Sequence, residues 1–535
     1  MSGTLVDAPP VADESLEQEP TNGPDLSALE DHVPLHLRAP RALAGLTLTV
    51  GLVFLFFCFR PLWHTDVWGH LAYGRLIWQT QSLPETEPLM PLAQGVRFVD
   101  TAWLSQLIGF GAISSLGVPG LQGLYALSVS ICAGLLAWRV YRTSRHGWFA
   151  LSAVLLFLTV TWSQLIVHRP QLAGMVCFVG LLALCTSRKP HKADWLMVPV
   201  LFAAWANLHG SFLMGLALLG CFVLGRAVDV MRRTGSLRSV LRDDRTRRRF
   251  LLLELAAVAV LLNPYGIGLY AEALQISSNP NLQELTEWAP LSLRDGQGQM
   301  FALVAVLLGM LYRWSPRRVR AWEVLALIGF GGAALWSSRL LVWWTPVAAL
   351  LVATHGYAVW RVSRHLPLVP EPAPRAGKWS VVTVGLVWIC FAYSPLGVKV
   401  MHGRNPEFKT PEFKKVVFSY TPVAAVEYLK KNPPQGMVFN IYEWGDYLQW
   451  NGPQGMKVFV NSHAHLVPRE VWQAYMQIIE QRSGWEDALD RYGVNTIVLD
   501  RDHREPLIKR LKEDEKWKVG FEQDGQVVFL RKKPI

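Results

Sequence analysis

Long apolar runs separated by short polar loops dominate the first three quarters of the chain. A helix needs about 20 mostly apolar residues to cross the hydrocarbon core of a bilayer, so runs of this kind predict spanning helices. They number about eleven and lie near 42–59, 118–138, 148–166, 171–187, 194–208, 211–230, 250–265, 299–313, 321–337, 340–359 and 379–396. The pattern predicts a polytopic α-helical membrane protein.

Both ends of the chain depart from this pattern. Residues 1–40 are rich in Pro, Asp and Glu, which predicts a disordered tail. From residue 399 to 535, strand-like runs (MVFNIY, KVFV, NTIVL and QVVFL) alternate with helical ones, and Thr421 and Pro422 can start a helix. We therefore expect a membrane bundle over 41–398 followed by a small soluble α/β domain.

Positive charge is concentrated in alternate loops, around 139–145, 188–192, 232–249 and 313–320. Loops that face the cytoplasm carry the excess of Lys and Arg, so these loops and the amino-terminal tail are expected inside. The other loops then lie outside: 168–172, 207–211, 263–266 and 337–341 are short, and 60–103 and 264–298 are long. With eleven spans, the carboxy-terminal domain lies outside too.

The first long outer loop contains two further apolar segments, at 67–80 and 103–117. In the first, Trp68, Leu71 and Trp78 fall on one side at helical spacing. Aromatic residues arranged in this way favour the level of the lipid headgroups. We expect both segments to form interfacial helices.

Composition excludes several classes of protein. Only 17% of the residues are charged and 51% are hydrophobic, whereas soluble domains have about 25% charged residues. The net charge of +11 comes from clusters between apolar runs without a nucleic-acid motif, so no nucleic-acid partner is expected. All six cysteines lie in apolar runs without paired spacing, which argues against a disulfide framework or a zinc site.

Asp66 is the first candidate for chemistry, because it follows the first spanning run and has Trp63, His64, Trp68 and His70 as neighbours. In such surroundings the local dielectric falls, which strengthens the interaction of a carboxylate with a proton, a metal or a cation. The alternative is that Asp66 only caps the interfacial helix.

Glu85 and Glu87 form a second acidic pair in the same loop. Paired carboxylates can bind a divalent cation through oxygen ligands, so a divalent cation is a possible cofactor. Two glutamates beside prolines are also typical of a solvated turn.

Several strong hydrogen-bond donors stand at the same outer membrane level. The planar guanidinium of an arginine suits a phosphate group, and ionisable groups at membrane depth are candidate functional residues. Snorkelling to the interface is the alternative for the arginines, although it does not account for Asn207 and His209. The donors are His168, Arg169, Asn207, His209 and Arg339, and the loop with Glu284, Glu287, Trp288, Arg294 and Asp295 adds carboxylates on that side.

These motifs together resemble a known family. In order they are DVWGHLAYGRLI, a proline-rich turn, WLSQ, HRPQ, NLHGSF, LNPYG, EWAP, a late outer arginine and YEWGDYLQW. The set is similar to that of bacterial membrane proteins of the glycosyltransferase-C superfamily that share a D-x-W-x-H-L loop and end in a soluble α/β domain. The resemblance covers most of 60–340 and resumes in the tail.

The resemblance implies a bundle with a cytoplasmic amino terminus in the bacterial inner membrane. It implies an enzyme that takes a sugar from a polyprenyl phosphate and passes it to an envelope acceptor outside the cytoplasm. Asp66 would match the carboxylate that acts as base or positions the acceptor, and Glu87 would match a second acidic residue. Arg169, His209 and Arg339 would neutralise the departing phosphate, with inversion at the sugar.

The sequence departs from the family pattern at two places. Where relatives often read E-W-L, this chain has Ala102 before Trp103; where they often read an acidic residue and G-R, it has Asn461, Ser462 and His463. These departures favour an alternative, a non-catalytic membrane scaffold that assembles with other membrane proteins. Transport is a weaker alternative, because the spanning runs contain few charges.

Overall fold

The computed structural model describes residues 32–187, 191–276, 278–367, 373–403 and 413–535. Most of the expected amino-terminal tail, residues 1–31, and residues 188–190 of one basic loop lie outside these ranges.

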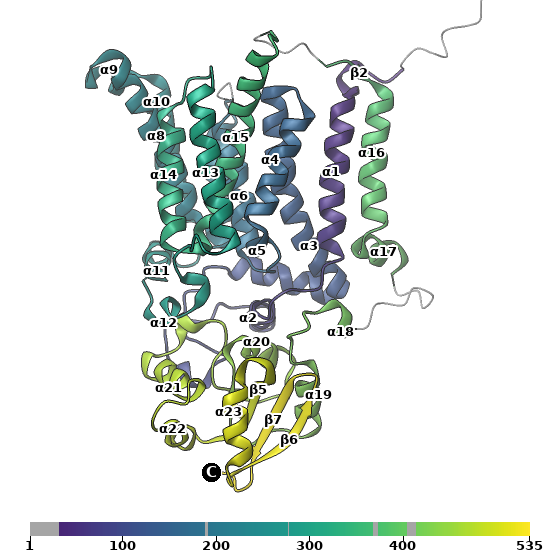
Figure 1. Cartoon of the computed structure of the whole chain (residues 1–535), viewed down its shortest axis with the longest axis vertical. Coiled ribbons are helices and arrows are strands. Elements are labelled where there is room, and N and C mark those ends of the chain that lie inside the picture. The colour runs from purple at the N-terminus through teal and green to yellow at the C-terminus, as the bar shows by residue number, and fades with distance from the viewer. Residues whose placement is uncertain (1–31, 188–190, 277, 368–372, 404–412) are drawn as a thin grey trace, which may run out of the picture.

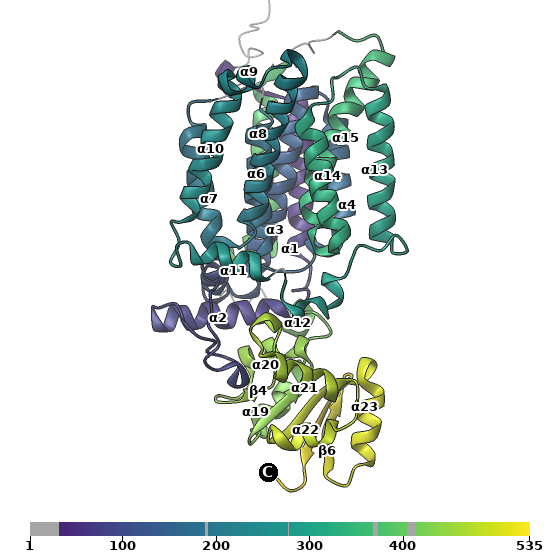
Figure 2. The same cartoon turned by 90° about the vertical axis from the view of Figure 1, so that its left-hand side faces the viewer.

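A bundle of helices that run side by side makes up the larger part of the molecule (Figures 1 and 2). Each apolar run identified in the sequence coincides with one of these helices. They are α1 (Arg41–Cys58), α3 (Trp103–Ser144), α4 (Gly147–Val160), α6 (Gln171–Cys185), α7 (Asp194–Leu208), α8 (Phe212–Thr234), α10 (Asp244–Val260), α13 (Gly296–Trp314), α14 (Ala321–Trp336), α15 (Leu341–Ser363) and α16 (Gly377–Ala392).

Fewer helices than this meet the criteria of length and composition for crossing a membrane. Among the described residues, four do so: α1, α3, α8 and the segment Ser338–Ser363; they become five if α16 and α17 (Pro395–His402), bent by 82°, form one span. The shorter apolar helices, such as α4 with 14 residues, extend only about 21 Å at 1.5 Å per residue. The molecule therefore has four to five candidate spans by this measure.

Helix α3 joins the second expected interfacial segment to a spanning helix. The break between them is at Gly117, whose φ of 69° and ψ of −160° are not helical, two residues before Pro119. Glycine adopts positive φ without the steric penalty that a Cβ imposes. The chain therefore changes direction at the boundary that the sequence indicated.

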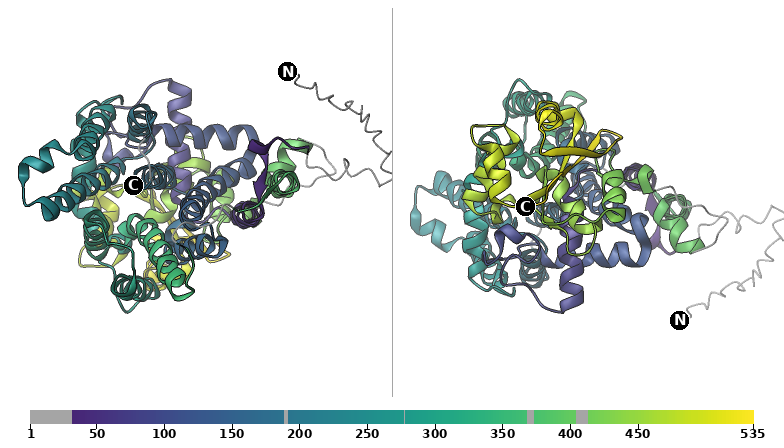
Figure 3. Two further views of the ribbon diagram at one scale, coloured as in Figure 1. Left: turned by 90° about the horizontal axis from the view of Figure 1, so that it is seen from above. Right: turned by 90° about the horizontal axis from the view of Figure 1, so that it is seen from below.

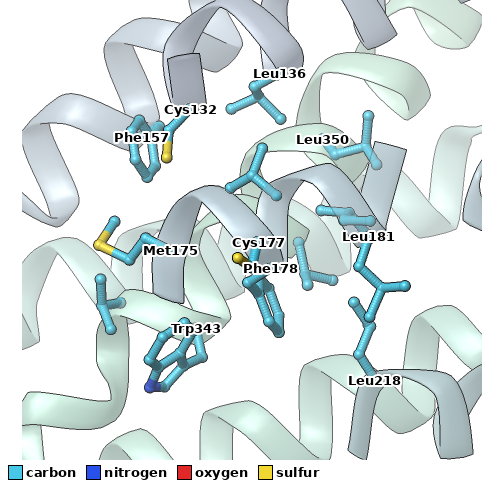
Figure 4. Packing of buried hydrophobic residues seen from close by; sticks show 14 of the residues in the cluster. Cys132, Leu136, Phe157, Met175, Cys177, Phe178, Leu181, Leu218, Trp343 and Leu350 are labelled. Atoms are coloured by element: carbon cyan, nitrogen blue, oxygen red, sulfur yellow. The ribbon is translucent and has the colours of Figure 1, made fainter. Parts of the chain in front are cut away.

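The core of the bundle surrounds α15, most of whose residues are buried. Figure 4 shows part of this packing, in which Phe178 of α6 contacts Trp343 of α15 with ring centroids 5.3 Å apart. Cys132 and Cys177 lie in the same core as free thiols. The last long helix, α16, packs beside α1, and the short strands β1 (Ala39–Pro40) and β2 (Arg375–Ala376) pair at their amino-terminal ends.

The carboxy-terminal part forms a five-stranded sheet with the strand order β4-β3-β5-β7-β6. The first three strands are parallel, and β7 is antiparallel to both of its neighbours. All four strand-like runs of the sequence become strands, and β6 is an additional edge strand. The strands are β3 (Met437–Asn440), β4 (Lys457–Val458), β5 (Val494–Asp500), β6 (Trp517–Gln523) and β7 (Gln526–Arg531); the helices are α18 (Phe413–Val416), α19 (Val423–Lys431), α20 (Tyr442–Asn451), α21 (Arg469–Ile479), α22 (Trp485–Arg491) and α23 (Arg501–Glu513).

Helix α2 (Asp66–Thr80) lies between the bundle and the sheet domain (Figures 1 and 2). Trp68 is fully buried and meets Tyr447 of α20 with ring centroids 5.2 Å apart. A Cβ on Gly69 would come within 2.2 Å of Asp446, so α20 approaches α2 closely at this glycine. The expectation that Trp68 lies among lipid headgroups is therefore wrong, because protein covers this residue, whereas Trp78 near the end of the same helix is 58% exposed.

The second long outer loop also contacts the sheet domain. Its short helices are α11 (Gly268–Ile276) and α12 (Pro280–Gln283). The amide of Asn281 donates hydrogen bonds to the backbone of Ala464 and Val467, and Trp472 donates to Glu284 at 2.9 Å. Seen from below, the sheet domain lies directly in front of the end of the bundle (Figure 3). Glu284 therefore belongs to a docking contact.

Candidate functional site

A cavity of about 650 Å³ lies where the bundle meets the sheet domain. Side chains from α2, the start of α3, the outer loops of the bundle and the sheet domain line it. Seven of the residues singled out in the sequence share this one cavity: Asp66, His70, Arg169, His209, Glu287, Trp288 and Arg339.

Asp66 lies at the centre of an ion-pair network. Both of its oxygens have partners: Arg169 donates from Nε to Oδ2 at 2.6 Å, and His64 Nδ1 lies 2.7 Å from Oδ1. Burial alone would raise the pKa of Asp66, but the charges of Arg169 and His64 hold that pKa well below its ordinary value. Asp66 is therefore a fixed carboxylate and a poor proton acceptor.

The carboxylate of Asp66 does not act as a helix cap. Asp66 is the first residue of α2, its N-cap is Thr65, and that N-cap makes no side-chain capping bond. The preceding His64 has a φ of 73°, a strained conformation for a residue with a Cβ. The local backbone thus directs His64 and Asp66 toward each other.

Glu287 links the two arginines of the cavity. Arg169 Nη1 donates to one of its oxygens at 2.6 Å, and Arg339 Nη1 donates to the other at 2.6 Å. The guanidinium of Arg339 also lies over the ring of Trp288, 5.1 Å from its centroid. Arg169 is thereby engaged by two carboxylates, whereas these contacts occupy a single nitrogen of Arg339.

His70 and His209 face the cavity as neutral imidazoles. Burial lowers the pKa of each to about 3. The Nδ1 atom of His209 accepts a hydrogen bond from the backbone N–H of Ser211 at 3.1 Å, which assigns the ring proton to Nε2. His209 can therefore donate a hydrogen bond but does not supply positive charge.

The structure adds a carboxylate that the sequence analysis missed. Asp100 lines the cavity and is 3% exposed. Its Oδ1 accepts hydrogen bonds from the backbone of Ala102 and from Gln106 Nε2, each at 3.0 Å, while Oδ2 has no partner among the described residues. Burial raises the pKa of Asp100 to about 7, which suits a group that exchanges a proton at neutral pH.

Asp100 also bears on the departure from the family pattern at Ala102. Ala102 is the N-cap residue of α3 and lines the cavity, and its backbone N–H holds Asp100. A carboxylate is therefore present two residues before the position where the family pattern has one. The signal in the sequence was an aspartate three residues before the helix that begins at Trp103.

The sheet domain contributes the remaining wall of the cavity through Ser462, His463 and His465. The ring of His463 lies 5.2 Å from that of His70 and 4.7 Å from that of Tyr73, between centroids. Its Nδ1 is buried without a partner among the described residues, and burial lowers its pKa to about 3. Two residues of the departure from the family pattern, Ser462 and His463, thus lie in the wall of the cavity.

Glu87 and Asn207, both singled out in the sequence, do not line the cavity. Glu87 is buried and accepts hydrogen bonds from Tyr73 Oη at 2.7 Å and from the backbone of Leu89 and Met90. Asn207 accepts from Trp103 Nε1 at 3.0 Å and donates to the backbone of Leu262. These contacts favour structural roles for both.

Replacing Glu87 by Gln is expected to lower the free energy of unfolding by about 1–3 kcal/mol, because a charged acceptor of three buried donors is replaced by a neutral one. The thermal unfolding midpoint of the purified protein in detergent measures the effect. An unchanged midpoint would contradict the structural role.

The described residues do not fit a divalent cation. No group of three or more His, Cys, Asp or Glu side chains among them is arranged to bind a metal. Asp66 and Glu287 are joined by the guanidinium of Arg169, which supplies positive charge at the place where a bridging cation would bind.

Comparison with known proteins identifies the fold. No family model and no curated protein matches the sequence. Solved structures do match. The oligosaccharyltransferase of Archaeoglobus fulgidus tethered with an acceptor peptide is 12% identical with a TM-score of 0.50, over 92% of this chain and 74% of that chain.

Two further structures contain lipid phosphates. The oligosaccharyltransferase AglB of the same organism, in complex with an inhibitory peptide and a dolichol-phosphate, is 10% identical with a TM-score of 0.51, over 86% of this chain and 69% of that one. ArnT from Cupriavidus metallidurans, bound to undecaprenyl phosphate, is 14% identical with a TM-score of 0.52, over 91% and 97%. The chain thus shares its fold with these three structures, in line with the fold that the resemblance of its sequence motifs implied.

Proposed function

We propose that this chain, which has the glycosyltransferase-C fold, transfers a sugar from a polyprenyl phosphate to an acceptor bound between the bundle and the sheet domain. One observation carries the proposal: a single cavity contains a buried carboxylate with an unpartnered oxygen, Asp100, and an arginine with open donors, Arg339. Proton acceptance and stabilisation of a leaving phosphate are the two requirements of this reaction.

The donor would bind on the bundle side of the cavity. Leu213, Met214 and Leu340 provide an apolar wall near the outer helix ends, which suits a polyprenyl chain. Arg339 offers guanidinium donors to the phosphate, and His209 offers its Nε2–H. Arginine suits this role because its fork matches phosphate oxygens and stays charged.

We assign Arg169 a positioning role instead of the phosphate-binding role expected from the sequence. Its guanidinium is engaged by Asp66 on one side and by Glu287 on the other. This leaves it less free than Arg339 to accept a new anionic partner. Arg169 would fix Asp66, which in turn orients the acceptor hydroxyl.

In the reaction, Asp100 Oδ2 takes the proton of the acceptor hydroxyl. The acceptor oxygen bonds to the anomeric carbon, and the bond between that carbon and the phosphate oxygen breaks. The electron pair leaves with the polyprenyl phosphate, whose charge Arg339 neutralises. A direct displacement of this kind inverts the anomeric centre.

We further propose that eleven helices cross the bacterial inner membrane, with the amino terminus in the cytoplasm and the sheet domain outside. In support, the cavity lies at the end of the bundle that carries the sheet domain, and the arginine-rich segment 237–249 lies at the opposite end (Figure 1). Cytoplasmic loops carry such an excess of basic residues. The acceptor would then be an envelope molecule.

A non-catalytic scaffold is the second candidate, and the ion pairs that engage both Asp66 and Glu287 favour it. A scaffold would copurify with a stoichiometric membrane protein in mild detergent. It would not bind a lipid phosphate in the cavity.

The purified protein is expected to bind undecaprenyl phosphate, with Arg339→Gln weakening that binding by tenfold or more, since a charge-assisted contact contributes roughly 1.5–3 kcal/mol. Asp66→Asn is expected to bind the lipid like the parent and to transfer sugar more slowly. The two assays are equilibrium lipid binding in detergent and sugar transfer from a labelled polyprenyl donor. Absence of lipid binding in the parent would overturn the proposed function, and an Asp66→Asn variant as fast as the parent would remove Asp66 from it.

A further inference from the structure

A second cavity of about 650 Å³ lies at the other end of the bundle, between the end of α3, the end of α6 and the start of α7. It is therefore remote from the sheet domain and from the reaction cavity (Figure 1). Its apolar wall includes Leu135, Trp138, Leu184 and Met197, of which Trp138 is 49% and Met197 47% exposed. Exposed apolar side chains on spanning helices face lipid.

Three arginines from the last turns of α3 line this cavity: Arg139, Arg142 and Arg145. Arg139 is held in place, because Nε donates to Thr186 Oγ1 at 2.8 Å, Nη1 donates to Thr143 Oγ1 at 2.6 Å, and Nη2 donates to the backbone oxygen of Thr186. Arg142 lies over the ring of Trp138, 5.8 Å from its centroid. The three guanidinium groups are thus gathered at one cavity mouth.

No carboxylate lines this cavity among the residues that the structure describes. Three other arginines at this end of the bundle pair with carboxylates of the protein: Arg226 with Asp243, Arg248 with Asp194, and Arg317 with Glu323. Arg142 and Arg145 form no ion pair with any residue in the described part of the chain. The charges of Arg142 and Arg145 are therefore left for an external anion.

We propose that this cavity binds the headgroup of an anionic phospholipid, with an acyl chain lying along Leu135, Leu184 and Met197. The combination of guanidinium groups at the membrane boundary with an apolar groove below them matches the two parts of such a lipid, and basic pockets between spanning helices bind anionic headgroups. A soluble anion would gain nothing from the apolar wall.

General orientation by positive charge is the competing explanation, and it makes a different prediction. If these arginines act only through net charge, any two exposed arginines at this end should contribute equally. Arg232 and Arg233, exposed at the end of α8, provide this comparison. A bound lipid instead depends on the location of the charge.

The experiment measures binding of fluorescent phosphatidylglycerol to the full-length protein in neutral detergent, with phosphatidylcholine as the uncharged comparison. The Arg142→Gln/Arg145→Gln double variant is expected to bind phosphatidylglycerol about thirtyfold more weakly, because each basic residue at the surface contributes about one kcal/mol. The matched Arg232→Gln/Arg233→Gln variant is expected to bind like the parent.

Three results would overturn the proposal: equal losses in the two double variants, equal affinity of the parent for phosphatidylcholine, or displacement of the lipid by inorganic phosphate at comparable concentration. Thermal unfolding of the variants separates loss of binding from loss of fold. Because the readout is lipid affinity, the result is independent of whether the chain transfers sugar.

Discussion

Replacing Asp100 by Asn is expected to lower kcat for sugar transfer by about 10²–10⁴-fold, the usual contribution of general acid–base catalysis. The amide has nearly the same shape and still accepts hydrogen bonds from Ala102 and Gln106, so binding of the donor lipid should be retained. Steady-state transfer rates and lipid affinity, measured on the same preparation, separate catalysis from binding.

The pH dependence provides an independent check on Asp100. Burial raises its pKa to about 7, and the base must be the ionised form, so kcat of the parent should rise as pH increases through about 7 and reach a plateau above it. The residual activity of Asp100→Asn should lack this rise. Glu87→Gln changes a buried carboxylate of the same loop outside the cavity lining. Because the charge of Glu87 contributes to the raised pKa of Asp100, this variant should keep the rise and move it to lower pH. A parent rate that does not change between pH 5 and 9 would exclude Asp100 as the base.

The fold could be anticipated because a bilayer imposes a strong and local signal. Apolar runs had to become helices, since backbone groups in lipid must be hydrogen-bonded within the chain. The break at Gly117 and the strands of the sheet domain were likewise visible in local residue patterns. The burial of Trp68 against α20 was not visible in such a pattern. An apolar helix face suits a lipid interface as well as it suits another helix.

The site was anticipated in part. Short loops at one end of a helical bundle bring their residues to the same level whatever the packing, and the structure places Arg169, His209 and Arg339 in one cavity. The different roles of Arg169 and Arg339 could not be predicted, because they depend on which arginine the carboxylates contact. Asp100 and Glu87 lie in the same loop, and only the folded chain distinguishes the one that faces the cavity from the one that holds Tyr73.

The residues that the sheet domain contributes to the cavity were the hardest to predict from the sequence. His463 is almost 400 residues from His70 in the chain, yet the rings lie 5.2 Å apart between centroids. Contacts of this separation depend on how α20 docks on α2, and the close approach of Asp446 to Gly69 is the detail that permits it. A residue pattern in either segment alone does not contain that information.

Replacing Arg169 by Gln is expected to reduce the free energy of unfolding by about 3–5 kcal/mol, because removing one member of a buried ion pair leaves its partner uncompensated. Asp66 would remain buried, with a carboxylate side chain only 10% exposed, and His64 as its main partner. Arg169→Lys keeps the charge but loses the planar fork, and we expect it to be intermediate. Thermal unfolding in detergent at neutral pH gives the order of the three proteins.

Two further measurements identify the ion pair as the cause. The Asp66→Asn/Arg169→Gln double variant removes the orphaned charge, so it should be more stable than Arg169→Gln alone, a coupling that unrelated sites do not show.

The parent holds the pKa of Asp66 well below its ordinary value mainly through Arg169; without the arginine, burial raises that pKa. Asp66 would then take up a proton as the pH falls, and the stability difference between parent and Arg169→Gln should narrow toward acid pH. A double variant as unstable as the sum of its two single variants, or a difference that does not vary with pH, would mean that Arg169 does not act by holding Asp66 ionised.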